Sequence, residues 1–185
     1  YRYETTLAEY GEKSKRVGYI AAAESRKEKM YRFCSDGQKL TDAVPGERFG
    51  RVTSVADVLP FWVGISNDKD VLLRILKKLE YPYGIAACEK TDEDFVGQWG
   101  YPNMWAPLVW FAFYALKAVG ALEEAVRIGK KYLSAVEDCF ADTGKLWEKY
   151  DAVNGGKATA NEYTETEMLG WTAGVYNDIY EEINQ

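Results

Sequence analysis

The sequence predicts an all-α protein that forms a single domain over residues 1–185. Three observations support this class: helix-forming residues recur in long stretches, their apolar members repeat at helical spacing, and capping residues or short turns separate the stretches. No convincing β-rich region is present. With 47% hydrophobic and 28% charged residues, the chain is long enough to bury a sizeable core.

The N-terminal segment predicts one long helix followed by a loop. Residues 3–33 are mainly helix formers with apolar side chains at helical spacing, and the weak points are Gly11 and Gly18. Ser-Asp-Gly at 35–37 ends this helix. Residues 38–50 contain Pro-Gly-Glu and have no clean period, so we expect a loop or a short hairpin-like excursion.

Two capped helices are expected next. Ser54 can cap a helix that continues to about Ile65 and is kinked or packed at Pro60. Asn67 or Asp68 can cap a second helix, which is amphipathic and faces a core. Its apolar residues at helical spacing are Val71, Leu72, Ile75, Leu76 and Leu79.

Residues 96–110 read V-G-Q-W-G-Y-P-N-M-W-A-P-L-V-W and interleave glycine, proline, amide and aromatic residues. Pro102 and Pro107 move the residues before them out of the helical region, so residues 101–103 should be extended or in a turn. Asn103 would then cap the helix that follows. From composition alone, a rigid helix entry lined with core aromatics is favoured over a binding loop.

Three further helices are predicted in the C-terminal half. Trp105–Val119 is apolar on nearly all sides, which indicates a buried helix that ends at the next glycine. Residues 121–140 are amphipathic, and A-D-T-G at 141–144 closes that helix. Residues 145–151 are expected to be irregular, and a Gly-Gly loop precedes a final helix from about Gly174 to Ile183.

Charge and hydropathy exclude several kinds of partner. The net charge of −6 and the pI near 4.9 argue against nucleic acid, because phosphate binding needs clustered Lys and Arg. The apolar runs are too short to span a membrane, and the N-terminal residues do not resemble a signal peptide, so no membrane partner is expected and a cytoplasmic location is favoured. Because the chain does not begin with Met, we expect Tyr1 to be an internal position and the N-terminus to be missing.

The sequence contains no histidine, which excludes imidazole bases and Ser-His-Asp sites and removes the commonest zinc ligand. The three cysteines are widely spaced, so no metal site and no cofactor is expected. Chemistry would therefore fall to carboxylates. Six Trp and fourteen Tyr beside 29 acidic residues suit a carbohydrate site, although core packing explains most aromatics. Taken singly, four acidic residues in or near loops are best explained as surface groups: Glu148, Glu162, Glu165 and Glu167.

Three separated motifs favour a functional site over the surface and core explanations given above. They are Q-W-G-Y-P-N-M-W-A-P at 98–107, E-K-Y-D at 148–151, and a Gly-rich loop that leads to E-Y at 162–163 and L-G-W-T-A-G at 169–174. In order and spacing they resemble the C-terminal part of the trehalase family of glycoside hydrolases, over roughly residues 96–178. Members of that family form an (α/α)6 toroid of six helical hairpins. The resemblance implies that this chain is a C-terminal fragment that supplies about half of the hairpins and one side of the pocket.

The resemblance also implies a mechanism and a set of site residues. The family consists of inverting glycosidases, in which one carboxylic acid protonates the leaving oxygen and a carboxylate on the opposite face activates water. Glu148 matches the general base, and Glu162 matches a substrate-contacting carboxylate and is the alternative base. Four residues match the lining of the sugar pocket: Gln98, Trp99, Asn103 and Trp171.

The family's general acid is an Asp in an earlier motif that these 185 residues do not contain. The resemblance therefore implies that the full-length protein hydrolyses a small carbohydrate, a disaccharide or an oligosaccharide. We expect the isolated fragment to be inactive, because it has a base without its acid. As half of a toroid it should also expose an apolar face and self-associate through that truncated face.

The motifs depart from the family pattern in four places. Gly100 stands where trehalases have Asp, Met104 where they have Ala or Gly, Ala173 where Asn is expected, and Lys157 in a shortened Gly-rich loop. Loss of a polar group and added bulk would change the hydrogen bonds to sugar hydroxyls. Two alternatives therefore stay open: a related helical-toroid hydrolase of another α-linked oligosaccharide, and a non-catalytic carbohydrate-binding or assembly protein.

Overall fold

The computed structural model describes residues 1–43, 50, 52–92, 97–158, 162–167 and 170–185. Within these ranges the chain is mainly helical, which confirms the predicted all-α class. The helices are α1 (Arg2–Tyr10), α2 (Arg16–Cys34), α3 (Leu59–Trp62), α4 (Lys69–Leu79), α5 (Ala106–Ala118), α6 (Leu122–Thr143) and α7 (Gly170–Asn184), with 3-10 turns η1 (Lys13–Lys15) and η2 (Val55–Val58). The strands are β1 (Glu80–Tyr81), β2 (Gly84–Ile85), β3 (Asn103–Trp105) and β4 (Lys149–Asp151).

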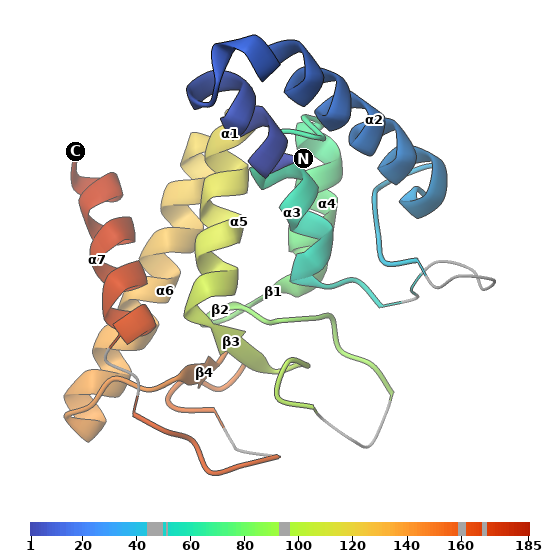
Figure 1. Ribbon diagram of the computed structural model, residues 1–185. Helices are drawn as coiled ribbons and strands as arrows, with labels where there is room; N and C mark the ends of the chain where they lie inside the picture. Colours follow the sequence, from blue (N-terminus) through green and yellow to red (C-terminus); the bar gives the residue numbers. More distant parts are fainter. Residues whose placement is uncertain (44–49, 51, 93–96, 159–161, 168–169) are drawn as a thin grey trace.

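Helices α4, α5, α6 and α7 run side by side, and loops gather at one end of them. Figure 1 shows α1 and α2 as a hairpin across one end of the molecule, while β3, β4 and the long connections lie at the opposite end. Helix α5 is central and contacts α3, α6 and α7. This arrangement explains why the predicted buried helix is apolar on all sides, since neighbours surround it.

Close helix packing around α5 depends on a small residue in α6. Gly129 is buried, and a Cβ atom there would lie 2.8 Å from Ile183 Cδ1 and 3.0 Å from Ile179 Cγ2 on α7. The same atom would lie 3.1 Å from Phe113 Cε2 on α5. The glycine therefore lets α6 approach both neighbours closely, which fixes the helix layer that carries the loops.

The prediction of one long helix over residues 3–33 is wrong. The chain breaks at Gly11, which is extended (φ −83°, ψ −165°), and then folds back so that α1 and α2 pack against each other. Arg26 of α2 donates two hydrogen bonds to Glu4 of α1, at 2.9 and 2.6 Å. Gly18, the other expected weak point, remains inside α2. The extended glycine and the ion pair between the two helices therefore favour a hairpin over one continuous helix.

Most predicted helix ends are confirmed. The Ser54 hydroxyl accepts a hydrogen bond from Ala56 N and forms a capping box with Asp57, although the segment it caps divides into η2 and α3, with Pro60 at the start of α3. Asp68 caps α4 by accepting a hydrogen bond from Val71 N at 3.0 Å. Gly144 ends α6 in the left-handed conformation, at φ +68°.

Three local predictions are wrong, and they concern the same end of the molecule. Asn103 does not cap a helix: it lies in β3, and α5 begins at Ala106 without a side-chain cap. Residues 145–151 were expected to be irregular but end in β4. The last helix begins at Gly170 and not near Gly174. Strands of three residues carry too few side chains to show an alternating pattern.

Three further expectations concern the turn at 45–47, membrane spans and the surface of the N-terminal hairpin. The predicted Pro-Gly-Glu turn at 45–47 lies outside the described residues. In the described helices, none combines the length and the apolar character that crossing a membrane requires. Helices α1 and α2 bury only Ala23 among their residues, so this hairpin presents most of its apolar side chains to the surface.

Candidate functional site

Two of the three sequence motifs pair directly in a short antiparallel ladder. Strand β3 comes from the 98–107 motif and β4 from E-K-Y-D, with Asn103 opposite Asp151 and Trp105 opposite Lys149. Every residue of both strands is buried. The ladder is held beside a third segment because Ala87 N donates a hydrogen bond to Asn103 O at 2.8 Å. Motifs more than 40 residues apart thus share one rigid platform, which the sequence alone did not predict.

The tryptophans of two motifs form an aromatic cluster at this platform. Trp99 stacks on Trp105, with ring centroids 4.1 Å apart and planes at 9°, and the edge of Trp171 meets Trp105 at 5.5 Å. The Trp105 indole N–H donates to Gln98 O at 2.8 Å, which ties the turn to the cluster. Trp99 is 53% exposed while Trp105 is buried, so one ring surface is open to solvent on a fixed base. Such a surface suits stacking on the C–H face of a sugar.

Glu148 directly precedes β4 and is bound by the two segments that follow. Its amide donates to Thr166 O at 3.0 Å, and its carbonyl accepts a hydrogen bond from the Trp171 indole at 3.2 Å. Its carboxylate accepts a hydrogen bond from the hydroxyl of Tyr163. Glu148 is half-buried, so the carboxylate is held by its neighbours and still reaches the surface.

Tyr163 is the hydrogen-bond donor in its contact with Glu148. Desolvation, followed by the hydrogen bond to Glu148 and the negative charge of that carboxylate, raises the pKa of the Tyr163 phenol to about 12. The phenol therefore keeps its proton at neutral pH and can donate it only as a hydrogen bond. One lone pair of Glu148 is thus oriented while the rest of the carboxylate stays available.

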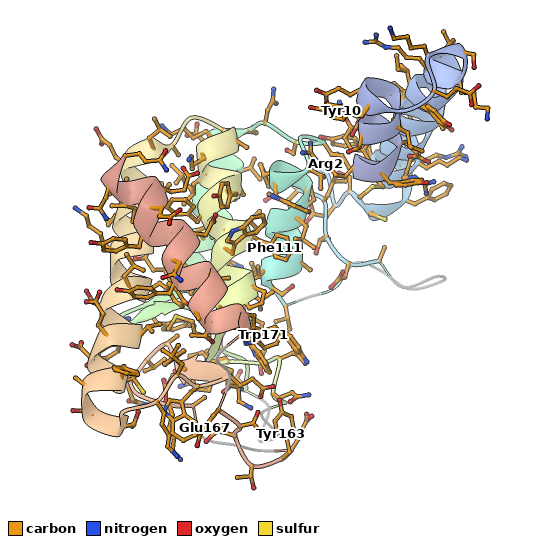
Figure 2. All side chains as sticks on the ribbon, turned by 60° about the vertical axis from the view of Figure 1, so that its left-hand side comes forward. Arg2, Tyr10, Phe111, Tyr163, Glu167 and Trp171 are labelled. Carbon is orange, nitrogen blue, oxygen red and sulfur yellow. The ribbon has the colours of Figure 1, made fainter. Side chains whose placement is uncertain are left out.

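Glu162 reaches back from the Gly-rich loop segment to the first motif. Its carboxylate accepts a hydrogen bond from Gln98 N at 3.3 Å, across 64 residues of sequence. Glu162 itself is exposed, whereas Gln98 is half-buried. Figure 2 shows Tyr163, Glu167 and Trp171 at the end of the molecule where the loops gather. Leu169 of the third motif lies outside the described residues, as does Val96.

Several buried polar atoms at this end lack a hydrogen-bond partner within the described part of the chain. An unpaired buried donor or acceptor costs about 1–3 kcal/mol, so several of them together at one end of the molecule are unusual. The atoms are Gln98 Oε1, Asn103 Oδ1, Lys149 Nζ and Glu165 Oε1.

The structure brings all six predicted site residues to one end of the molecule. Gln98, Trp99 and Asn103 come from the turn and β3, Glu148 and Glu162 from the segments beside β4, and Trp171 from the first turn of α7. Asn103 is 1% exposed, so its side chain belongs to the floor of the site. Its amide group donates to Gly97 O at 3.3 Å and leaves its oxygen unpaired among the described residues.

Sequence reasoning missed three contributors to this region. Lys149 and Tyr163 belong to the quoted motifs, but the sequence predicts no role for either, because their contacts depend on how β3 and β4 pair. Glu165 was interpreted as a surface acid, but its side chain is 6% exposed and lies 3.9 Å from Lys157. The described residues contain no cluster of three or more Cys, Asp or Glu side chains that could hold a metal ion.

One expected change at the site is located elsewhere. The bulk of Met104 was expected to change the hydrogen bonds to sugar hydroxyls, but its side chain is fully buried and packs against Gly84, where a Cβ atom would lie 2.1 Å from Met104 Sδ. Alternate residues of a strand point to opposite faces, so Met104 faces the core while its neighbours face the site. The extra bulk is accommodated by the glycine. The departure at Gly100 remains within the site, in the turn before β3.

Comparison with known proteins agrees with these motifs and extends them. The sequence model of the Trehalase family matches residues 8–184. The chain is 33% identical to human trehalase over 131 residues, and 37% identical over 133 residues to a periplasmic trehalase of Xanthomonas axonopodis pv. citri. These matches cover 65% and 68% of this chain and 22% of each relative. The chain thus spans about a fifth of the length of the curated relatives.

Solved structures show the same helical arrangement. The neutral trehalase of Saccharomyces cerevisiae superposes with a TM-score of 0.71 at 24% identity, covering 88% of this chain and 30% of that one. A mannosylglycerate hydrolase from Thermus thermophilus, solved with glucose, gives 0.69 at 17% identity, covering 98% and 42%. The fold is therefore part of an all-α helical toroid, and the chain belongs to the trehalase family of glycoside hydrolases.

Proposed function

We propose that this chain is the C-terminal portion of an inverting α-glycosidase that hydrolyses trehalose or a similar small α-glucoside. The observation that carries the proposal is the β3–β4 ladder, which sets β4, directly after Glu148, against β3 of the first motif, while Trp171 of the third motif donates a hydrogen bond to the Glu148 carbonyl. A carboxylate on a rigid base next to an exposed ring face and unpaired polar atoms suits a sugar and a water molecule. Family membership supports the same reading.

In this mechanism Glu148 is the general base. It removes a proton from a water molecule whose oxygen attacks the anomeric carbon, while a carboxylic acid on the opposite face gives its proton to the leaving oxygen. The C–O bond to the leaving sugar breaks as the new one forms, so the configuration inverts. In inverting enzymes the two carboxyl groups lie roughly 6.5–9.5 Å apart, which leaves room for the water.

The general acid would come from an Asp in an earlier part of the family domain, outside these 185 residues. Trp99 would stack on the sugar, and Gln98, Asn103 and Glu162 would bind its hydroxyls, with Trp171 holding the Glu148 backbone. We expect the chain alone to be inactive, because loss of general-acid catalysis costs roughly 10² to 10⁴-fold in rate. Turnover by the isolated 185 residues would contradict this part of the proposal.

The direct test is a chimera in which this chain replaces the matching region of the Xanthomonas axonopodis periplasmic trehalase, to which it is 37% identical. Proton NMR of the fresh products gives both activity and stereochemistry. Inversion of α,α-trehalose releases one β-glucose and one α-glucose per event. A folded chimera that releases only α-glucose would contradict the inverting mechanism, and one that binds glucose without hydrolysing any α-glucoside would favour a carbohydrate-binding protein.

A related hydrolase of another α-linked oligosaccharide is the second candidate, and Gly100 is the residue that favours it. Gly100 N donates to Gly97 O at 2.9 Å in the turn before β3, so the residue lies beside Gln98 and Trp99. Trehalases carry a carboxylate at this position, and a site that lacks one hydrogen-bonding group can change its substrate preference by orders of magnitude. Assay of the chimera on a panel of α-linked disaccharides separates the two candidates.

A further inference from the structure

Lys149 is a basic residue for which the described ranges provide no counter-ion. The residue is fully buried in β4, and its Nζ atom has no hydrogen-bond partner among the residues that the structure describes. Burying an ammonium group without a partner is costly, so such a group is retained only where something stabilises it. The position is therefore unusual for a side chain that merely fills space.

Two aromatic rings stabilise this ammonium group. Nζ lies 5.3 Å from the ring centroid of Trp105, its partner across the ladder, and 4.7 Å from the ring centroid of Tyr163. A cation attracts the negative face of an aromatic ring, and the attraction is larger when water is excluded. Trp105 is fixed in β3, whereas Tyr163 belongs to the loop segment and is 38% exposed. The lysine thus lies between the ring of Trp105, which belongs to a strand, and the ring of Tyr163, which lies outside the helices and strands.

Tyr163 is bound at both ends by neighbouring residues of the same motif. Its ring contacts Lys149, and its hydroxyl donates to the carboxylate of Glu148. The adjacent backbone is also attached there, since Glu148 N donates to Thr166 O at 3.0 Å. Loss of the ring contact would release the tyrosine together with the hydrogen bond that orients Glu148.

We propose that Lys149 is a positioning residue whose buried ammonium group holds the ring of Tyr163 against β4 and thereby orients the hydroxyl toward Glu148. The lysine itself does not touch substrate in this account. Its importance for catalysis rests on the proposed role of Glu148 as the base, but the contact between Lys149 and Tyr163 can be tested without any sugar.

Hydrogen exchange of the Glu148 amide in the full 185-residue chain provides the readout. This N–H is bonded to Thr166 O, so it exchanges when the segment of Tyr163 opens. The amide of Ala86, bonded to Leu79 O in the core, is the internal control. Lys149→Met, which removes the charge and keeps the length, should speed exchange at Glu148 on the order of tenfold. It should leave Ala86 unchanged, and Lys149→Arg should restore slow exchange.

A double-mutant cycle separates positioning from general support of the fold. In the Tyr163→Phe background, which keeps the ring, Lys149→Met should speed exchange at Glu148 as much as it does in the wild-type chain. In the Tyr163→Leu background, which lacks the ring, it should have no further effect. An equal effect in all three backgrounds, or none, would overturn the proposal. If Lys149→Met does not fold, Tyr163→Leu and Tyr163→Phe are compared with Lys149 intact. Exchange about tenfold faster in the Leu variant supports the contact, and equal rates refute it.

The outcome is distinguishable from that of the proposed function. If the chimera is inactive but the cycle shows coupling, the contact stands and only the assignment of Glu148 as the base fails. If the chimera hydrolyses an α-glucoside and the two positions behave independently, the role of Lys149 fails while the glycosidase proposal survives.

Discussion

Gln98 donates a backbone hydrogen bond to the carboxylate of Glu162 at 3.3 Å, although 64 residues separate them. The contact joins the first motif to the segment after the Gly-rich loop, and both residues were proposed from the sequence to bind sugar. A turn whose backbone is tied to an acidic side chain in this way keeps its aromatic and amide groups in place. The residues within that turn are therefore the natural targets for testing substrate choice.

Restoring the acidic residue of the family motif should change specificity. In the chimera, Gly100→Asp should raise kcat/KM for trehalose relative to other α-linked disaccharides by roughly 10- to 1,000-fold, because it returns a hydrogen-bonding group to the site. A Cβ atom at position 100 would lie 3.1 Å from Gly97 O, so the turn must shift slightly. Gly100→Ala introduces the same shift without the carboxylate and is the matched control. If both variants give the same ratio, the carboxylate is not responsible.

The helix layer should respond in opposite ways to two glycine replacements. Gly129→Ala should destabilise the fold by about 1–3 kcal/mol, because its methyl group would overlap Ile179 and Ile183 of α7. Gly174→Ala should stabilise it by up to about 1 kcal/mol, since that position of α7 has open space around it and alanine favours the helix. Urea unfolding of both variants measures the difference. Equal effects would show that α6 and α7 do not pack closely at Gly129.

The fold could be predicted from sequence where long periodic segments dominate, as in α4 and α6. It could not be predicted at Gly11, because residues 3–33 contain helix formers throughout and the hairpin is set by contacts between the two halves. The candidate site residues were proposed from motifs, while the β3–β4 ladder that pairs two of these motifs was not predicted. Its strands are three residues long, and a strand of that length is defined by its partner and not by its own pattern.

Stability should depend on pH through Glu80, whose carboxylate binds Arg127 and Lys131 and so joins β1 to α6. The hydrogen bond from Arg127, followed by that from Lys131, outweighs burial and lowers the pKa of Glu80 below 4.5. Because the pKa of Glu80 is lower in the folded state than in the unfolded state, the stabilisation is present above pH 4.5. It is lost as the pH falls through the pKa of Glu80 in the folded state.

Glu80→Gln should therefore cost about 1 kcal/mol at pH 7, a modest value because the Arg127 side chain is 47% exposed to solvent. The difference from the wild-type chain should shrink as the pH is lowered toward 3. Unfolding in urea at both pH values measures it. A difference that stays constant with pH would show that the charge of Glu80 does not contribute.

The α1–α2 hairpin should mediate self-association of the isolated chain. Its surface carries Tyr10 at 78% and Val17 at 81% exposure, among other apolar residues. Exposed apolar side chains can be covered by a protein partner, and we propose that a second copy covers these. Sedimentation velocity should show oligomers whose fraction rises with concentration. Replacing both residues with Lys should give monomers, while Phe140→Lys on α6 should not, and a wild-type chain that is monomeric at all concentrations would contradict the proposal.

The central claim is that Glu148 acts as the general base, and one substitution tests it most directly. Glu148→Gln keeps the shape of the side chain and can still contact Tyr163, but it cannot accept a proton from water. In the chimera it should lower kcat by at least roughly 10² to 10⁴-fold while sugar binding, measured by tryptophan fluorescence, changes little. Glu162→Gln, at the alternative base, should retain more turnover than this variant. Full activity of Glu148→Gln would remove Glu148 from the mechanism.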